Sequence, residues 1–174
     1  MQLTEEKSYS VLGYRLDLEQ ITLYSIYALS FAIPLLIGKP QLLVGSSINF
    51  LITLTVLKYG FKRSIPVLLT PSLVATGTGL LFGGATLFLV YLMPFIMLSN
   101  VLLAYTISKQ KSVLGILGGI FLKVLFLYIA TYILVQTISL PNIFLTSMGL
   151  IQIYTALIGG GIAFLLYRFT TPKN

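Results

Sequence analysis

Long apolar stretches separated by short polar breaks run through the chain from residue 20 to the C-terminal region. A transmembrane helix needs about 20 mainly apolar residues. Six stretches approach that length, at residues 20–38, 41–58, 64–82, 85–107, 112–136 and 143–168. The breaks between them contain Gly, Pro, Asn or Lys, which are typical of turns. The pattern therefore predicts an all-α integral membrane protein, built as a bundle of six transmembrane helices.

The third stretch differs from the others because it contains two prolines, Pro66 and Pro71, together with several hydroxyl side chains. Irregular backbone at membrane depth persists only where it is buried in protein or lines a water-filled cavity. Two interpretations are therefore open for residues 64–82, an irregular span or a re-entrant loop.

The placement of basic residues favours six full spans. With six spans and a cytoplasmic N-terminus, Lys39 is the one cation in the outer loops, and nine cations fall inside: Lys7, Arg15, Lys58, Lys62, Arg63, Lys109, Lys111, Arg168 and Lys173. This asymmetry follows the positive-inside rule. We therefore expect both termini in the cytoplasm, a polar cytoplasmic segment at residues 1–19 and a membrane domain at residues 20–170.

Composition excludes several classes of function. Only 9% of the residues are charged, and the net charge of +7 arises from cations at span ends, where anionic lipid attracts them. No nucleic-acid partner is needed to explain it. The chain has no Cys and no His, and its acids all precede residue 20: Glu5, Glu6, Asp17 and Glu19. We therefore expect no metal site, no cofactor, no enzymatic activity and no pump that works alone.

Lys123 lies about eleven residues into the fifth stretch, with apolar residues on both sides. A lysine at the centre of a bilayer costs about 2.5–3.5 kcal/mol on insertion scales, and ionisable residues there are functional by default. No carboxylate in the other stretches can pair with it. One interpretation is a counter-ion for an anionic group of a bound small molecule. The other is a structural lysine bonded to carbonyls or reaching toward the interface.

Other polar residues at similar depth are candidates for ligand contact. They are Asn49 in the second stretch, Tyr128 and Tyr132 after Lys123, and Gln152 and Tyr154 in the sixth. The alternative is that the amides bond between helices and the tyrosines anchor the interface. Asn100 lies deeper in the fourth stretch, where a packing or gating role is at least as plausible as ligand contact.

Small residues four apart let transmembrane helices approach closely. Ala28 and Ala32 have this spacing in the first stretch, Gly115 and Gly119 have it in the fifth, and glycines 159–161 crowd the sixth. The simpler explanation for these small residues is packing between helices of the same chain. The more specific explanation is docking of a membrane partner.

The chain resembles the substrate-binding S component of an energy-coupling-factor (ECF) transporter over about residues 20–170. The segment ALSFA, from Ala28 to Ala32, matches the AxxxA pattern by which such proteins dock on their coupling subunit. The fifth stretch, LGGIFLKVLFLYIA, is similar to that of thiamin-binding members, which place a Lys and then aromatics there. The last, YTALIGGGIAFLLYRF, is similar to the family's small-residue-rich final helix.

This resemblance implies a vitamin-like substrate, bound in the outer half of a multi-pass protein of the prokaryotic cell membrane. The implied site is Lys123, Tyr128, Tyr132, Gln152 and Tyr154. The implied partners are a membrane coupling subunit, which docks at the two alanines, and two ABC ATPases. The chain departs from thiamin-binding members by lacking Trp, His and later acids. Lys123 better suits a substrate with an anionic group.

Two other functional classes remain open at the level of sequence. A membrane scaffold resembling the MreD type of cell-shape protein has similar size and span count and needs no small-molecule ligand. A lipid-modifying enzyme is disfavoured because the membrane segments contain no acid, His or Cys.

Overall fold

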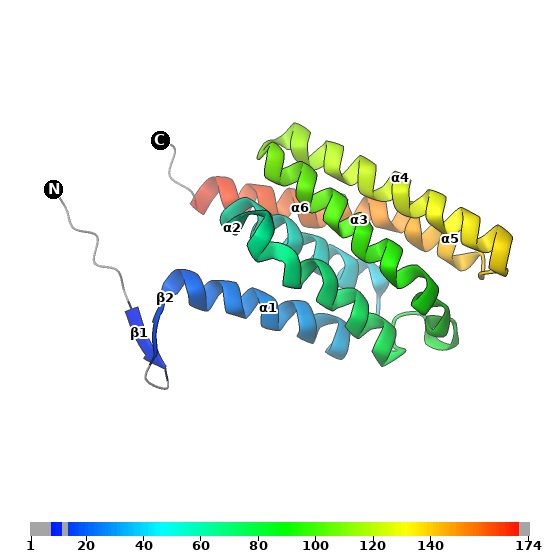
Figure 1. Cartoon of the computed structure of the whole chain (residues 1–174), viewed down its shortest axis with the longest axis horizontal. Coiled ribbons are helices and arrows are strands. Elements are labelled where there is room, and N and C mark those ends of the chain that lie inside the picture. The colour runs from blue at the N-terminus through cyan, green and yellow to red at the C-terminus, as the bar shows by residue number, and fades with distance from the viewer. Residues whose placement is uncertain (1–7, 12–13, 171–174) are drawn as a thin grey trace.

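The computed structural model describes residues 8–11 and 14–170, which form a bundle of helices preceded by two short strands (Figure 1). Strands β1 (Ser8–Val11) and β2 (Tyr14–Asp17) pair antiparallel, with Ser8 opposite Asp17. Four of the charged residues named above lie outside the described residues: Glu5, Glu6, Lys7 and Lys173.

Helices account for nearly all of the chain between residues 18 and 170. The long ones are α1 (Leu18–Leu36), α2 (Gln41–Thr78), α3 (Leu89–Lys109), α4 (Val113–Ile138) and α6 (Leu150–Thr170). The short 3₁₀ helix η1 (Gly83–Phe88) leads into α3, and the short helix α5 (Ile143–Met148) leads into α6.

Five helical segments of the described chain are long and apolar enough to cross a membrane. Two of them join a short helix to a long one, η1 to α3 and α5 to α6. The predicted all-helical class is therefore confirmed for the bundle, and its composition is compatible with a multi-pass membrane protein. The helix ends agree with the predicted stretches to within a few residues, apart from the length of α2.

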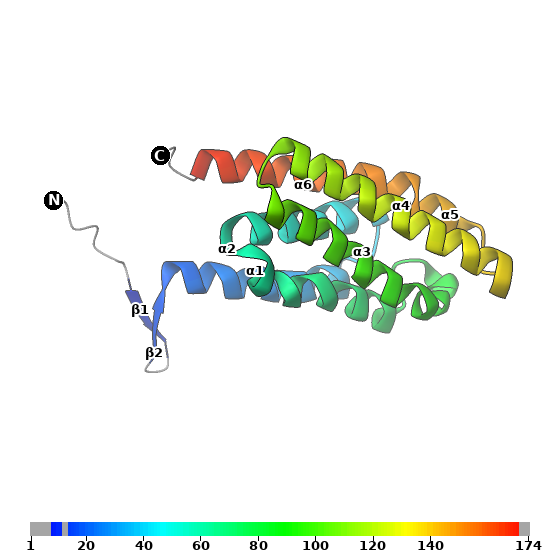
Figure 2. The same cartoon turned by 45° about the horizontal axis from the view of Figure 1, so that its top comes forward.

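Helix α2 contains 38 residues because it joins the second and third predicted stretches across a reversal at Gly60. Gly60 has φ 80° and ψ 175°, a conformation essentially restricted to glycine. The reversal exposes carbonyl groups that lack helical partners. Lys111 Nζ donates to the Leu57 carbonyl at 2.9 Å, and Ser64 Oγ donates to the Gly60 carbonyl at 2.8 Å. The two halves of α2 then run back alongside each other, as the ribbons show (Figures 1 and 2).

The irregular backbone expected across residues 64–82 is confined to the end of that segment. Both prolines lie inside regular helix, and the helix ends only where Gly79 adopts φ 71° and ψ 1°. Membrane helices tolerate proline because neighbouring helices can bond to the nearby backbone. Asn100 Nδ2 of α3 donates to the Leu68 carbonyl at 3.1 Å, next to the Val67 carbonyl that Pro71 leaves without a helical donor.

Helix α2 is the central element, because α1, α3 and α6 all pack against it. Its contribution to the core includes large side chains that are almost fully buried, namely Ile52, Val56, Leu57, Val67 and Leu68. Helix α4 joins the bundle mainly through α3, with further contacts to α5 and α6. The polar residues that approach α2 from α3, α4 and α6 therefore meet inside the bundle.

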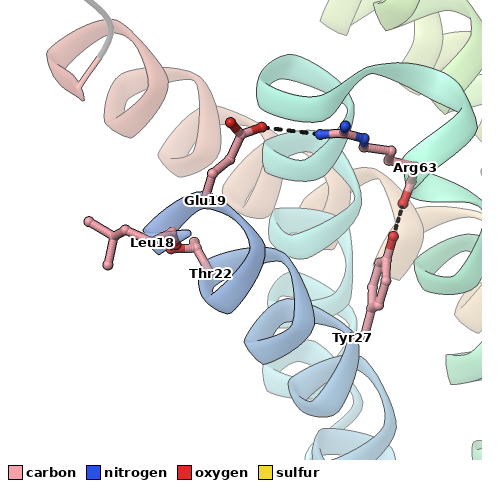
Figure 3. Close-up of polar contacts among 5 residues, drawn as sticks. All are labelled: Leu18, Glu19, Thr22, Tyr27 and Arg63. Carbon is pink, nitrogen blue, oxygen red and sulfur yellow. Dashed lines mark hydrogen bonds and ion pairs between the residues drawn. The ribbon is translucent and has the colours of Figure 1, made fainter. Parts of the chain in front are cut away.

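The start of α1, the Gly60 reversal and the end of α6 lie at one end of the bundle (Figures 1 and 2). Polar contacts tie α1 to the reversal there (Figure 3). Arg63 Nη1 lies 3.1 Å from Glu19 Oε1, and Tyr27 Oη donates to the Arg63 carbonyl at 2.5 Å. The opposite end of the bundle carries Lys39 beside the turns at residues 79–88.

Candidate functional site

Lys123 of α4 is buried inside the bundle, with 3% of its surface exposed. Its Nζ donates to Asn49 Oδ1 of α2 at 2.6 Å and to Asn100 Oδ1 of α3 at 2.8 Å. Three residues far apart in sequence thus meet at one point.

Each asparagine is held in place by its other amide atom. Asn49 Nδ2 donates to the Gly45 carbonyl at 2.9 Å and to Thr155 Oγ1 of α6 at 3.2 Å. Asn100 Nδ2 donates to the Leu68 carbonyl of the second half of α2. These bonds fix both amides with their oxygens toward Lys123, so the lysine is positioned by both halves of α2 and by α3 and α6.

Lys123 has no carboxylate partner among the described residues. Its two partners are neutral amides, and the described chain holds only two carboxylates, Asp17 and Glu19, at the start of α1. An ammonium group has three N–H donors, of which two are used here. A buried ammonium is stabilised fully only when a negative charge and further acceptors are supplied. The site is therefore suited to an anionic group.

A cavity of about 80 Å³ borders this lysine. One water molecule needs about 10–15 Å³ by the same measure, so there is space for several waters. The polar wall consists of Gln41, Asn49, Ser72, Asn100, Lys123, Gln152 and Thr155. The apolar wall comes from Pro34, Val44, Gly45, Ile48, Pro71, Ala75, Leu81, Leu89, Ile96 and Met148. Convergent polar groups in a mostly apolar cavity are typical of ligand sites.

Gln152 is the second unusual group in this wall. Its side-chain Oε1 is buried and accepts no hydrogen bond from the described protein. Buried polar atoms nearly always have a partner, so such an exception indicates a water or ligand that completes the site. The cavity thus offers a free donor on Lys123 and a free acceptor on Gln152.

The structure brings together three of the residues expected to bind substrate, namely Asn49, Lys123 and Gln152. The three tyrosines lie elsewhere, because Tyr128, Tyr132 and Tyr154 are 44%, 50% and 53% exposed on the outside of the bundle and do not line this cavity. Tyr128 and Tyr132 lie five and nine positions beyond Lys123 on α4. At about 100° per residue, they therefore point to about the opposite side of the helix from Lys123.

Asn100 is a central member of the site, although its sequence context favoured packing or gating at least as strongly. The sequence does not distinguish Thr155, because a lone threonine in an apolar helix has no characteristic pattern. Asn100 can be recognised from the sequence, because it is an amide within an apolar stretch. Thr155 is recognisable only from the packing of α6 against α2.

The small residues divide into two groups. Gly115, Gly119 and Gly159 pack against neighbouring backbone or side chains, since a Cβ at Gly159 would lie 2.3 Å from the Ser46 carbonyl oxygen. For these three, internal packing is confirmed. Ala28 is exposed and Ala32 is partly exposed on the outer side of α1, whose buried face is Leu23, Ile26, Ser30 and Pro34.

No protein-family model, no curated protein and no solved structure matches this chain.

Proposed function

We propose that this protein captures a small molecule with an anionic group inside the membrane, as the substrate-binding subunit of an ECF-type micronutrient importer. The observation that carries the proposal is the buried Lys123 on the wall of a cavity, with amide partners but no carboxylate partner among the described residues. An anionic ligand supplies the missing charge, and the cavity supplies the space.

The proposed topology is six crossings of a prokaryotic cell membrane with both termini in the cytoplasm. The reversal at Gly60 divides α2 into two halves, each close to the length of a single span, which supports six crossings rather than five. The basic residues at the Gly60 reversal, the α3–α4 turn and the end of α6 gather at one end of the bundle, opposite Lys39. The positive-inside rule places that end in the cytoplasm.

Transport by this subunit requires energy from other proteins. The helices of the bundle contain no carboxylate beyond Glu19, so they lack the groups that usually carry proton coupling. A membrane coupling subunit and two ABC ATPases supply the energy in the proposed assembly. The exposed outer side of α1, with Ala28 and Ala32, offers the coupling subunit a surface that α2 does not cover.

An affinity pull-down of the tagged protein from its native membranes tests the assembly. We expect mass spectrometry to identify two ABC-type ATPases and one membrane coupling protein. Paired substitutions Ala28→Leu and Ala32→Leu should reduce their recovery, because larger side chains prevent close helix approach. The control is Leu29→Ala, on the same exposed side of α1 but with no added bulk. Recovery of cell-shape proteins without ATPases would reject the proposal.

A ligand-free membrane scaffold is the second candidate. The feature that favours it is the pair of hydrogen bonds from Lys123 to Asn49 and Asn100, which tie three helices together without a ligand. Lys123→Met separates the two functions, since Met keeps much of the side-chain length without the charge. Under the capture proposal this variant folds and recovers the partners but loses binding. A variant that no longer folds would favour the scaffold.

A further inference from the structure

We infer that the ligand of this cavity is a small aliphatic carboxylate that carries its own uncharged hydrogen-bond donor, such as a hydroxyl or amide N–H. The inference rests on the proposed function, because it takes the Lys123 cavity to be the capture site. It adds the chemical class of the ligand, which follows from four properties of the cavity wall.

The first property is the supply of positive charge. Lys123 is the single charged group in the wall, and two of its three N–H groups are already bonded to Asn49 and Asn100. A phosphate monoester has a charge of about −1.5 to −2 and three strong acceptor oxygens. One ammonium with one free N–H cannot satisfy such a group, whereas it matches a carboxylate of charge −1. The wall therefore selects a monoanion.

The second property is the unpaired acceptor on Gln152. The Oε1 atom needs a donor, and leaving it unpaired in the complex would weaken binding. Lys123 and Gln152 border the same cavity, so one small ligand can reach both groups. The ligand should thus carry its donor and its carboxylate within one small molecule.

The third property is the absence of a carboxylate from the wall. A ligand ammonium would be a second buried cation beside Lys123, with no negative protein group to offset it. The donor that reaches Gln152 should therefore be neutral. This requirement disfavours amino acids and favours hydroxy acids or acids with an amide.

The fourth property is the absence of aromatic side chains. None of the 17 residues that border the cavity is Phe, Tyr or Trp. Planar rings in binding sites gain from stacking or edge contacts with aromatic residues. The apolar wall here is built from aliphatic side chains and two prolines, so it suits a branched aliphatic body better than a flat ring.

Titration calorimetry on the purified protein in lipid nanodiscs tests this inference with compounds of matched size. The probes are 2-hydroxy-3-methylbutanoate, 3-methylbutanoate, benzoate and methyl phosphate. We expect the hydroxy acid to bind most tightly and the acid without the hydroxyl to bind at least about tenfold more weakly, since the site would then leave Gln152 unpaired. Gln152→Leu should remove the difference between the two, and Lys123→Met should abolish binding of both.

Tyr154→Phe is the control, because Tyr154 lies on the same helix as Gln152 but outside the cavity, and it should behave as wild type. Lys123-dependent binding in which benzoate or methyl phosphate exceeds the hydroxy acid would overturn the ligand class and leave the proposed function intact. Failure of every probe to bind a folded wild-type protein would overturn the inference. If the pull-down then also lacked ATPases, the proposed function would fail with it.

Discussion

At the scale of single residues, the molecule holds a buried cation with neutral groups. Lys123 is bonded by two asparagine oxygens, and each asparagine is anchored by its nitrogen to a backbone carbonyl. The amides offset part of the cost of taking an ammonium out of water, but they bring no negative charge. A network in which every member depends on the others is costly to break at one point.

Substitution Asn100→Leu should therefore destabilise the fold. It leaves the buried Lys123 with one of its two acceptors, and a buried polar group that loses its partner costs about 1–3 kcal/mol. The free energy of unfolding, measured by denaturant titration in detergent micelles, checks this. Adding Lys123→Met to Asn100→Leu should recover part of the loss, because the uncompensated charge is then removed. If the protein with Asn100→Leu alone were as stable as wild type, the network would not be structural.

At the scale of elements, close approach between helices depends on where each glycine points. Gly159 faces α2, where an added Cβ would lie 2.3 Å from the Ser46 carbonyl oxygen and 2.6 Å from the Phe50 nitrogen. Gly161, two residues later on the same helix, faces open space, with no atom within 4 Å of an added Cβ. The contact between α2 and α6 thus depends on Gly159 and not on Gly161.

Gly159→Ala should lower the unfolding temperature of the detergent-solubilised protein, because two backbones in contact would have to separate. Gly161→Ala should leave it unchanged or raise it slightly, since alanine is favoured over glycine in a helix by about 1 kcal/mol. Circular dichroism during heating measures both. The interpretation of α2–α6 packing would be contradicted by equal effects of the two substitutions.

At the scale of the whole molecule, the arrangement is set by a central helix that reverses. Because α2 turns back at Gly60, its two halves contribute Asn49 and Ser72 to the same cavity. The reversal also brings the start of α1 and the end of α6 to one end of the bundle, as the two views show (Figures 1 and 2). An even number of crossings follows if each half of α2 spans the membrane.

Cysteine accessibility tests this topology directly, because the natural chain contains no Cys. Lys39→Cys and Lys109→Cys place single thiols at exposed positions at opposite ends of the bundle. In intact cells, a membrane-impermeant maleimide should label position 39 and not position 109. Lysed cells should show labelling at both positions. Labelling of position 109 in intact cells would reject the proposed orientation.

The sequence alone determined the helical class and the approximate helix ends, and it singled out Lys123 as a lysine among apolar residues. These depend on local composition, since long apolar runs, turn residues and a lysine among apolar neighbours are visible without knowledge of packing. It also identified Asn49 and Gln152 as polar groups at a similar depth.

Only the tertiary structure decided which polar groups meet. Asn100 and Thr155 join Lys123 because α3 and α6 both pack against α2, whereas the three tyrosines point outward from their helices. The backbone between Pro66 and Pro71 stays helical, and a side chain of α3 bonds to it at the Leu68 carbonyl. Contacts between residues as far apart as Asn49 and Thr155 depend on how the helices pack and rotate against one another, and neither spacing nor composition in one sequence records those angles.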